Sequence, residues 1–539
     1  MFKTLSANKF TFLLALFYTC VFNIPLFEIV ARGVQKQADV NWVFIASFPI
    51  LLTCLLSLIF SLFSFRFLAK PFFILLTLLS SSVFFGMWKY GIVFDRPMME
   101  NIFETNPAEA SMYLNWASVL NMLLTGLLPA WLIFKAPIEY RSAGKELLHK
   151  LGFMLAMVLV SGVILGVYYQ NYVAFGRNND VMKQYIVPTY FIGSAAKYVN
   201  QHYFEKPIPY TQLGTDAKQK PSVAGKPKVT VLVIGETARA MNYQYYGYGR
   251  ETNAYTAKLG LAVFGKTISC GTATAQSLPC MLSRFDRDNY DVRRAKAQDS
   301  VIDVASHAGL AVTWIDNDSG CKGACDRVEH ELIKLDADPA LCDGESCFDQ
   351  ILLHRLDDKL AALDGRDSLI VLHVMGSHGP TYFRRYPDDH RFFTPDCQRS
   401  DIQNCSAEEL MNTYDNTIRY TDYILAEVVS RLQAVSDKAD TAMMYISDHG
   451  ESLGEKGMYL HGAPYAFAPS EQIEIPWLLW LSDSFAATTG KDKNCLKTSL
   501  GRGEFSHDYL FDTLLGLLHV ETSVYRRQTD ALAECNVQV

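Results

Sequence analysis

Five long stretches without a charged residue, all before residue 177, constrain this chain more than any other feature of its sequence. They cover residues 10 to 27, 41 to 65, 71 to 88, 110 to 134 and 151 to 176. Each is long enough to cross a bilayer core, which takes roughly 20 helical residues. A single stretch of this kind can also be a buried helix of a soluble protein, but a succession of them predicts a membrane domain. Residues 1–176 are therefore expected to form five transmembrane spans.

The charges between these stretches predict the orientation of the spans. The first stretch is not expected to be a cleaved signal peptide, because it contains Pro25 and lacks a small-residue cleavage site before Glu28. Basic residues gather before the first span, after the second and after the fourth: Lys3, Lys9, Arg66, Lys70, Lys135, Arg141, Lys145 and Lys150. Positively charged loops stay in the cytoplasm. An odd number of spans that starts inside places everything after residue 176 outside.

The cysteines test this topology independently. Ten of the twelve follow the last expected span, and only Cys20 and Cys54 lie within the spans. Most are close neighbours, which suggests the pairs Cys270 with Cys280, Cys321 with Cys325, Cys342 with Cys347 and Cys397 with Cys405, and leaves Cys495 with Cys535. Such spacing indicates disulfides in an exported domain, although sequence alone does not fix the connectivity. A zinc site at Cys321 and Cys325 is the alternative, but no matching histidine pattern follows.

The outer half divides into a connecting segment and a globular domain. Residues 177–228 comprise an aromatic stretch, which suits interfacial helices, and a Lys, Pro and Gly-rich linker from residue 216. The domain itself, residues 229–539, alternates apolar runs with segments of helical spacing. The runs are Val229 to Ile234, Ala311 to Ile315, Leu369 to Val374, Ala442 to Ile446 and Trp477 to Leu481; the helical segments are 299–308, 349–364, 406–433 and 505–519. This pattern predicts an α/β domain with a central parallel sheet covered on both faces.

Polar residues follow three of these runs directly. Glu236 follows the first, His378 the third, and Asp448 with His449 the fourth. Ligands of parallel sheets bind beyond the carboxyl ends of the strands, so these residues are expected to meet at one edge. Glu236, Asp448 and His449 form a ligand set suited to Zn²⁺. Each alone is more simply a helix cap or a satisfied polar residue, but together they indicate a metal site.

Two further features belong to the same chemistry. His378 and His461, each beside a glycine in a loop, are candidates for a second metal or for a phosphate oxygen. The segment 269–280 is small, rich in hydroxyl groups and bracketed by Cys270 and Cys280. One of its hydroxyls is a candidate nucleophile activated by a metal. Spacing alone does not choose among Thr272, Thr274 and Ser277, and a simple surface turn is the alternative.

These motifs resemble one family over the whole chain. The strings are Gly235-Glu236-Thr237-Ala238-Arg239, Cys270 to Cys280, Asp316 to Arg327, Gly376-Ser377-His378-Gly379-Pro380 and Ser447-Asp448-His449-Gly450-Glu451-Ser452-Leu453-Gly454. In this order they resemble the phosphoethanolamine transferases that modify lipid A, a group that includes the mobile colistin-resistance enzymes. The resemblance implies an outer domain of the alkaline phosphatase and sulfatase type. The sulfatase branch itself needs Cys-x-Pro-x-Arg, and Cys280 to Arg284 lacks the proline.

The resemblance also implies roles for particular residues. Thr274 matches the nucleophile of the family, and Glu236, Thr274, Asp448 and His449 match the ligands of its principal zinc. His378 and His461 match residues that bind a second zinc or the phosphate of the substrate. Lys322 and Asp318 match positions near the phosphoethanolamine group, although some members carry Asn in place of Asp318.

The implied reaction takes place in the inner membrane of a Gram-negative bacterium, with the N-terminus in the cytoplasm and the catalytic domain in the periplasm. Phosphoethanolamine passes from phosphatidylethanolamine to Thr274 and then to a lipid A phosphate, which lowers the negative charge of the outer membrane and gives polymyxin resistance. The aromatic stretch 177–215 and the loop 89–109 are then expected to meet the donor lipid. The enzyme is expected to be a monomer.

Two other functions are weighed against this one. A phosphoglycerol transferase resembling lipoteichoic acid synthase shares the spans and a threonine nucleophile, but the dense cysteine pairing disfavours it. A non-catalytic lipid transporter would be expected to bury ionisable residues within its spans, and these five contain none. The formal net charge of −7 and the lack of a basic cluster in the outer domain give no reason to expect nucleic-acid binding.

Overall fold

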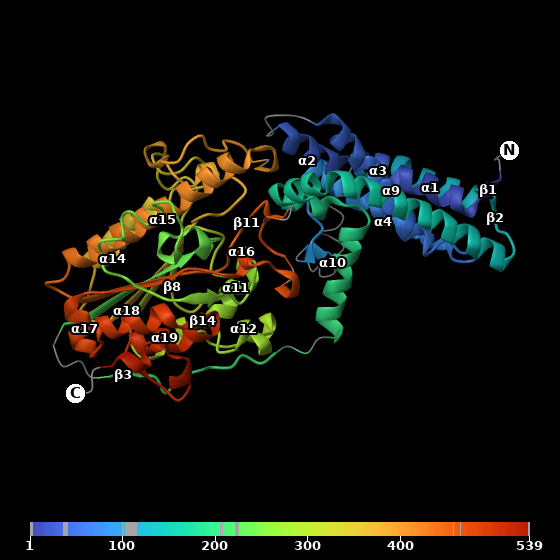
Figure 1. Cartoon of the computed structure of the whole chain (residues 1–539). Coiled ribbons are helices and arrows are strands. Elements are labelled where there is room, and N and C mark those ends of the chain that lie inside the picture. The colour runs from blue at the N-terminus through green and yellow to red at the C-terminus, as the bar shows by residue number, and fades with distance from the viewer. Residues whose placement is uncertain are drawn as a thin grey trace. The chain divides into compact units, whose positions relative to one another are not determined.

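The structure is a computed structural model of the chain (Figure 1). It describes residues 4–35, 41–96, 98–99, 102, 116–204, 206, 208–220, 226–400, 402–455, 458–463 and 465–536. The chain divides into two compact units, Met1–Pro207 and Ile208–Val539. The segment that follows residue 176 is thus grouped with the first unit as far as Pro207. Within the loop 89–109, residues 97, 100, 101 and 103–109 lie outside the described residues.

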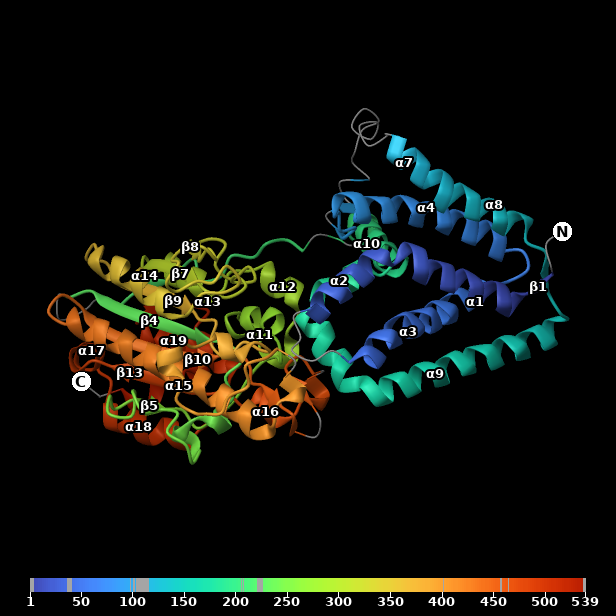
Figure 2. The same ribbon diagram turned by 90° about the horizontal axis from the view of Figure 1, so that it is seen from above.

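The first unit is a set of apolar helices that run side by side (Figure 2). Among the described residues four helical segments are each long and apolar enough to be a candidate span. They are Trp42–Ser61 (α3), Ala69–Lys89 (within α4, Ala69–Tyr90), Trp116–Lys135 (α7, Trp116–Asn121, continuing into α8, Leu128–Lys135) and Ala143–Arg177 (within α9, Ala143–Asn178, which has a kink at Tyr168). Only 6% of the most apolar window of the last span is buried inside the protein. An apolar helix with so little protein contact is typical of one that faces lipid.

The first expected span is bent. It consists of α1 (Ala7–Phe17), a π-helical turn (Tyr18–Phe22) and α2 (Ile24–Gln35), and its two parts meet at 59°. Asn23 stands at the break, where its side chain donates to Tyr18 O and Val187 O and accepts from Val187 N. The described residues therefore contain five candidate spans if this bent pair crosses as one, and four otherwise.

The second unit contains a seven-stranded sheet in the order β5-β13-β10-β4-β9-β7-β8. The strands are β4 (Lys228–Gly235), β5 (Ala262–Val263), β7 (Ala311–Asp316), β8 (Glu329–Leu332), β9 (Ser368–His373), β10 (Asp440–Ser447) and β13 (Trp477–Leu481). All five expected runs are strands. The expectation of a parallel sheet holds from β10 to β8, whereas β13 pairs with β10 in the antiparallel direction.

Helices cover both faces of this sheet (Figures 1 and 2). One face packs on α14 (Gln350–Ala361) and α15 (Ala407–Ala434), and the other on α11 (Thr274–Met281), α13 (Val301–His307), α18 (Lys493–Arg502) and α19 (Leu510–Leu517). Because each central strand is buried on both sides, it reads as a continuous apolar run and not as an alternating one.

The sequence left two strands of the sheet unpredicted, and both are edge strands. β8 is polar and mostly exposed, and β5 has only two residues, so neither has the apolar run of a buried strand. The expected linker also contains a short strand, because Lys218–Gln219 (β3) pairs with Val520–Glu521 (β15).

Five disulfides join the neighbouring cysteines of the second unit. They are Cys270–Cys280, Cys321–Cys325, Cys342–Cys347, Cys397–Cys405 and Cys495–Cys535. Cys321 and Cys325 are bonded to each other, so their thiolates do not form the alternative zinc site.

Candidate active site

The alternation of side chains along the central strands decides which polar residues meet. Leu232 and Ile234 of β4 face the core covered by α11, and Glu236 continues that phase beyond the strand. Met444 and Ile446 of β10 face the same core, and Asp448 continues them. Because β4 and β10 are parallel neighbours, the two carboxylates arrive at the same edge of the sheet.

Glu236, Asp448 and His449 form a fully buried cluster in which their ligand atoms lie within 4.8 Å of one another. Nε2 of His449 lies 3.5 Å from Oε1 of Glu236 and 3.3 Å from Oδ2 of Asp448. Nδ1 of His449 is 2.9 Å from Gly450 O, which can only accept. The ring proton therefore sits on Nδ1, and Nε2 keeps its lone pair for the cluster.

The electrostatics of this cluster fit a divalent cation. Burial raises the pKa of Glu236, and the neighbouring Asp448 raises it further. Burial likewise raises the pKa of Asp448, to about 6. Among the described residues no lysine or arginine pairs with either carboxylate, and Oδ2 of Asp448 takes no hydrogen bond. Two desolvated carboxylates beside an imidazole lone pair are a donor set that Zn²⁺ satisfies.

Thr274 is the hydroxyl that the structure brings to this cluster. It is the first residue of α11, and its Oγ1 donates to Oε2 of Glu236 at 2.9 Å and lies 3.4 Å from Nε2 of His449. The other two candidates are directed elsewhere. Thr272 Oγ1 donates to Ala463 O at 2.7 Å, and Ser277 Oγ donates to Asp448 O. Of the three hydroxyls left open by the sequence, only Thr274 faces the carboxylates.

His507, which the sequence did not single out, joins the segment 269–280 to the end of β10. Its Nδ1 accepts from Cys270 N at 3.0 Å, and its Nε2 donates to Ser447 O at 2.9 Å. The backbone N–H of Cys270 can only donate and the backbone oxygen of Ser447 can only accept. The ring of His507 is therefore neutral, with its proton on Nε2. In agreement, burial lowers the pKa of His507 to about 4. In the sequence His507 is a lone histidine far from any motif, so no local pattern indicates this role.

His378 and His461 lie beside the first cluster. Their ligand atoms and one of Glu236 lie within 4.8 Å of one another, and the two imidazole rings are 5.9 Å apart. Nδ1 of His461 lies 3.2 Å from Oε2 of the buried Glu451. Gly376 lets the loop that carries His378 pass close to Glu236. Its φ is 50°, and a Cβ there would stand 2.8 Å from Glu236 O. The pair His378 and His461 therefore shares Glu236 with the first cluster.

Asp318 and Lys322 occupy the loop after β7. Asp318 has ligand atoms within 4.8 Å of those of Glu236 and His373. Nζ of Lys322 donates to the backbone and hydroxyl oxygens of Ser319, both at 2.6 Å, and the Ser319 hydroxyl donates to Asp318 at 2.7 Å. His373 was hidden from sequence reasoning because it lies inside an apolar run.

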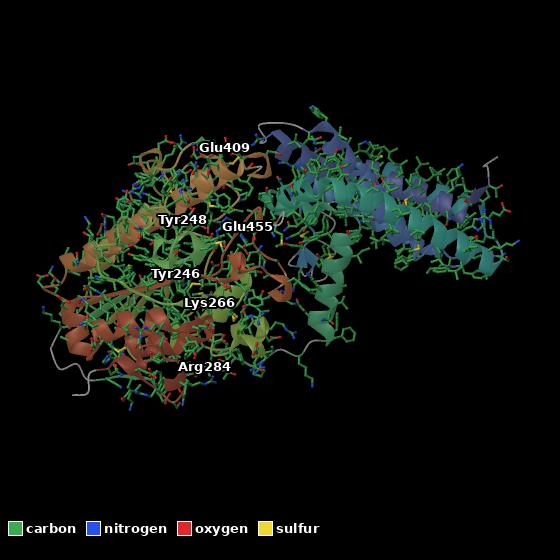
Figure 3. All side chains as sticks on the ribbon, in the orientation of Figure 1. Tyr246, Tyr248, Lys266, Arg284, Glu409 and Glu455 are labelled. Carbon is green, nitrogen blue, oxygen red and sulfur yellow. A yellow bond between two sulfur atoms is a disulfide. The ribbon has the colours of Figure 1, made fainter. Side chains whose placement is uncertain are left out.

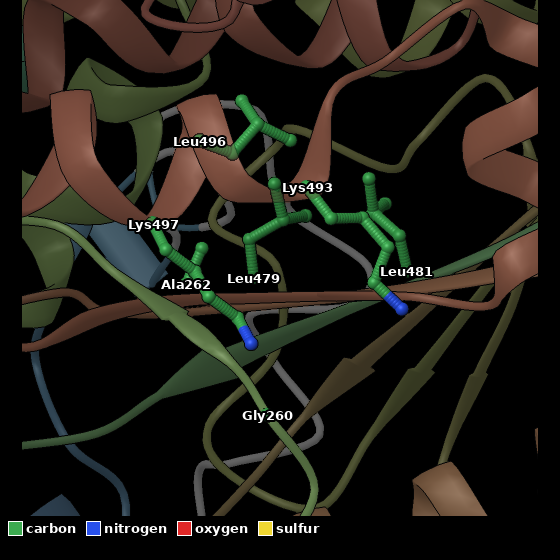
Figure 4. A pocket seen from close by; sticks show the side chains of 7 residues that line it. All are labelled: Gly260, Ala262, Leu479, Leu481, Lys493, Leu496 and Lys497. Atoms are coloured by element: carbon green, nitrogen blue, oxygen red, sulfur yellow. The ribbon is translucent and has the colours of Figure 1, made fainter.

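The loop after β4 is anchored by Arg239, a buried residue of the first motif. Its guanidinium donates to Oε1 of Glu455 at 2.6 Å, a residue labelled in Figure 3, and stacks over Tyr414. A separate small pocket lies at the β5 and β13 edge between Lys493 and Lys497 (Figure 4), and none of the candidate site residues lines it.

The fold and the buried cluster define a sulfatase-type catalytic domain, and comparison with known proteins agrees. The Sulfatase family matches residues 228–520, and the family described as Phosphoethanolamine transferase EptA/EptB matches residues 52–203. The chain is 38% identical to phosphoethanolamine transferase EptA of Escherichia coli K12, over 97% of this chain and 96% of that one. It is 35% identical to phosphatidylethanolamine transferase Mcr-1 of Escherichia coli, over 96% and 95%.

A solved structure matches across both units. The integral membrane lipooligosaccharide phosphoethanolamine transferase A of Neisseria meningitidis superposes with a TM-score of 0.67 at 37% identity, over 99% of this chain and all of that one. The chain belongs to the phosphoethanolamine transferases. The resemblance drawn from the motifs and the α/β domain on a helical membrane unit are thus confirmed.

Proposed function

We propose that this enzyme transfers phosphoethanolamine from phosphatidylethanolamine to a lipid A phosphate through a covalent intermediate on Thr274. The observation that carries the proposal is the hydrogen bond of the Thr274 hydroxyl to Glu236 within a buried cluster of metal donors. The names of two relatives support the substrates, since one is a phosphatidylethanolamine transferase and another is a lipooligosaccharide phosphoethanolamine transferase.

Glu236, Thr274, Asp448 and His449 would hold one Zn²⁺, and His378 with His461 would hold a second or bind a phosphate oxygen of the substrate. When bound, zinc lowers the pKa of a hydroxyl and stabilises negative charge that develops at phosphorus. The residues themselves orient the nucleophile and exclude water, because Glu236, Asp448 and His449 are fully buried.

In the first step, Oγ1 of Thr274 attacks the donor phosphorus and its proton passes to Glu236. The bond from phosphorus to the glycerol oxygen breaks, and diacylglycerol leaves after that oxygen takes a proton. His378 or His461 can supply this proton when the two histidines bind the phosphate and not a second zinc. In the second step an oxygen of a monoprotonated lipid A phosphate attacks the phosphorus on Thr274, and the bond from phosphorus to Oγ1 breaks. Oγ1 takes back the proton held by Glu236, and the proton of the lipid A phosphate returns to the histidine. Two steps allow one site to serve two bulky lipids in turn.

Lys322 and Asp318 are proposed to lie near the phosphoethanolamine group, where the lysine can attract the phosphate. The membrane unit would lie in the inner membrane of a Gram-negative bacterium, with the N-terminus in the cytoplasm and the catalytic domain in the periplasm. There the added ethanolamine would lower the negative charge of the outer membrane and give polymyxin resistance. A monomer suffices for this chemistry, because all the proposed residues belong to one chain.

Mass spectrometry of the protein expressed in a polymyxin-sensitive host tests the proposal. We expect phosphoethanolamine on Thr274, a gain of one phosphoethanolamine on lipid A, and loss of both in Thr274→Ala. Thr274→Ser keeps a hydroxyl and serves as the matched control. Full transfer by Thr274→Ala would disprove the assignment of the nucleophile. Transfer of phosphoglycerol in place of phosphoethanolamine from labelled lipids would favour the phosphoglycerol transferase, and no metal-dependent release of diacylglycerol would favour the transporter.

A further inference from the structure

A third group of metal donors lies on the side of Glu236 that faces away from β10. It belongs to three neighbouring parallel strands, β4, β9 and β7, whose register places Ile234, His373 and Asp316 side by side. Side chains two residues apart share a face, and Leu369, Val371 and Trp314 line the same core as Ile234. His373 therefore reaches the same edge as Glu236, with Asp316 on its other side.

The ring of His373 is held by a carboxylate that is itself fixed. Nδ1 of His373 lies 2.8 Å from Oδ2 of Asp316. That same oxygen accepts from Trp314 Nε1 at 2.9 Å, and Oδ1 of Asp316 accepts from the backbone N–H groups of Asp318 and Gly320, each at 3.0 Å. The carboxylate thus accepts at both oxygens, and Nδ1 of His373 is the donor.

The other ring nitrogen has no such partner. His373 is fully buried, and Nε2 makes no hydrogen bond to any of the described residues. One ring nitrogen of His373 lies within 4.8 Å of carboxylate oxygens of both Glu236 and Asp318, and Nδ1 is already bonded to Asp316. Oδ2 of Asp318 accepts from Ser319 Oγ at 2.7 Å, which leaves Oδ1 to offer. A histidine that donates one N–H to a carboxylate and presents its other nitrogen to two more carboxylates has the arrangement found around protein-bound metals.

We propose that Glu236, Asp318 and His373 hold a divalent cation, separate from the sites at Asp448 with His449 and at His378 with His461. Two carboxylate oxygens and one imidazole nitrogen suit Zn²⁺ or Mn²⁺. Glu236 would be shared between this cation and the zinc beside Thr274. Asp318 then binds this cation, and Asp316 positions the histidine ligand.

This inference rests on the proposed function only through the place of Glu236 in both sites, and a metal count tests it without reference to the transfer reaction. The full-length protein in detergent is stripped of metal, dialysed against Zn²⁺ or Mn²⁺ alone, and analysed for bound metal per chain. We expect the wild type to bind one ion more than His373→Ala. His354→Ala, which changes an exposed histidine of α14, should bind the same number as the wild type.

A second variant covers the case in which His373→Ala does not fold. Asp316→Asn keeps all three ligands but weakens the hold on the imidazole, and loss of such a supporting carboxylate typically lowers metal affinity by about 10 to 100-fold. Loss of no ion in His373→Ala, or of every ion at once, would overturn the proposal, as would an unchanged affinity in Asp316→Asn. A correct metal count in a protein without phosphoethanolamine transfer would instead refute the proposed function alone.

Discussion

Thr272, Thr274 and Ser277 lie within one disulfide-closed segment, yet each hydroxyl has a different environment. Ser277 is fully buried, and its bond to Asp448 O supports the residue that would hold zinc without facing the substrate space. Thr272 bonds to the loop that follows His461. At the scale of the residue, the direction of the hydroxyl and not the residue type separates the proposed nucleophile, Thr274, from its neighbours.

Single substitutions should therefore separate these roles. We expect Thr272→Ala and Ser277→Ala to retain phosphoethanolamine on Thr274, whereas Ser277→Ala should lower the free energy of unfolding by about 1 to 2 kcal/mol because a buried carbonyl loses its donor. Peptide mapping and denaturant unfolding measure the two effects. Phosphoethanolamine on another residue of the segment 269–280 in either variant would contradict the assignment of Thr274 as the nucleophile.

His507 predicts a dependence of stability on pH. Its pKa is about 4 in the folded protein, below the ordinary value of about 6.5, because burial disfavours the charged ring. Between those values the unfolded chain binds a proton that the folded chain does not, so stability is lost as the pH falls from about 6.5 towards 4, by up to roughly 3 kcal/mol.

Carboxylates titrate in the same window, so the measured quantity is the difference between variants. Between pH 7 and 4.5 the free energy of unfolding should fall with decreasing pH in both proteins. The fall should be smaller in His507→Gln than in the wild type. His354→Gln on the exposed face of α14 is the control and should follow the wild type. Parallel curves for His507→Gln and the wild type would contradict the neutral, buried role.

At the scale of the element, the disulfides constrain loops of very different importance to the site. Cys270–Cys280 closes a segment of 10 residues that carries Thr274 into α11, and Cys495–Cys535 closes one of 40 residues at the base of α18. On the chain-entropy account the longer loop contributes more stability, about 4 kcal/mol against about 3.

Stability and activity should consequently respond in opposite order. Replacing both cysteines of the 495–535 pair by alanine should cost more in the free energy of unfolding, whereas replacing the 270–280 pair should cost more in phosphoethanolamine transfer. Denaturant unfolding and the labelling of Thr274 in the folded fraction measure the two. Equal loss of labelling in both double variants would show that the short loop has no special role in holding the nucleophile.

At the scale of the whole molecule, the bend at Asn23 decides the topology. If the bent pair α1 and α2 crosses the membrane as one span, the part of the chain that the structure describes has five spans, and its first and last residues lie on opposite sides. If the pair does not cross, four spans remain in that part and its first and last residues lie on the same side. The basic residues before the first span and in the loop before α9 favour the first arrangement.

Reporter fusions distinguish the two topologies. A phosphatase that is active only outside the cytoplasm, fused after residue 536, should be active, and the same reporter fused within the loop between α8 and α9, after Arg141, should be silent. A fluorescent protein that folds only in the cytoplasm should give the reverse pattern. Activity of the phosphatase at both positions, or at neither, would refute the orientation proposed here.

The sequence by itself determined the features that depend on local pattern. Uninterrupted apolar runs predicted the candidate spans and the five buried strands, because a segment surrounded by lipid or by helices on both faces must be apolar throughout. Residues directly after such runs, Glu236, Asp448 and His449, could be placed at one sheet edge because parallel strands end together.

The tertiary structure decided whatever depends on the register of strands and on distant partners. The antiparallel direction of β13, the direction of the Thr274 hydroxyl, and the bond of Asn23 to Val187 all join residues far apart in the chain. His373 is the clearest case, since it reads as one polar letter in an apolar strand, and only the pairing of β9 with β4 and β7 brings it between Glu236 and Asp316. Such contacts leave no local pattern, because the residues on either side of them are chosen for the core and not for the site.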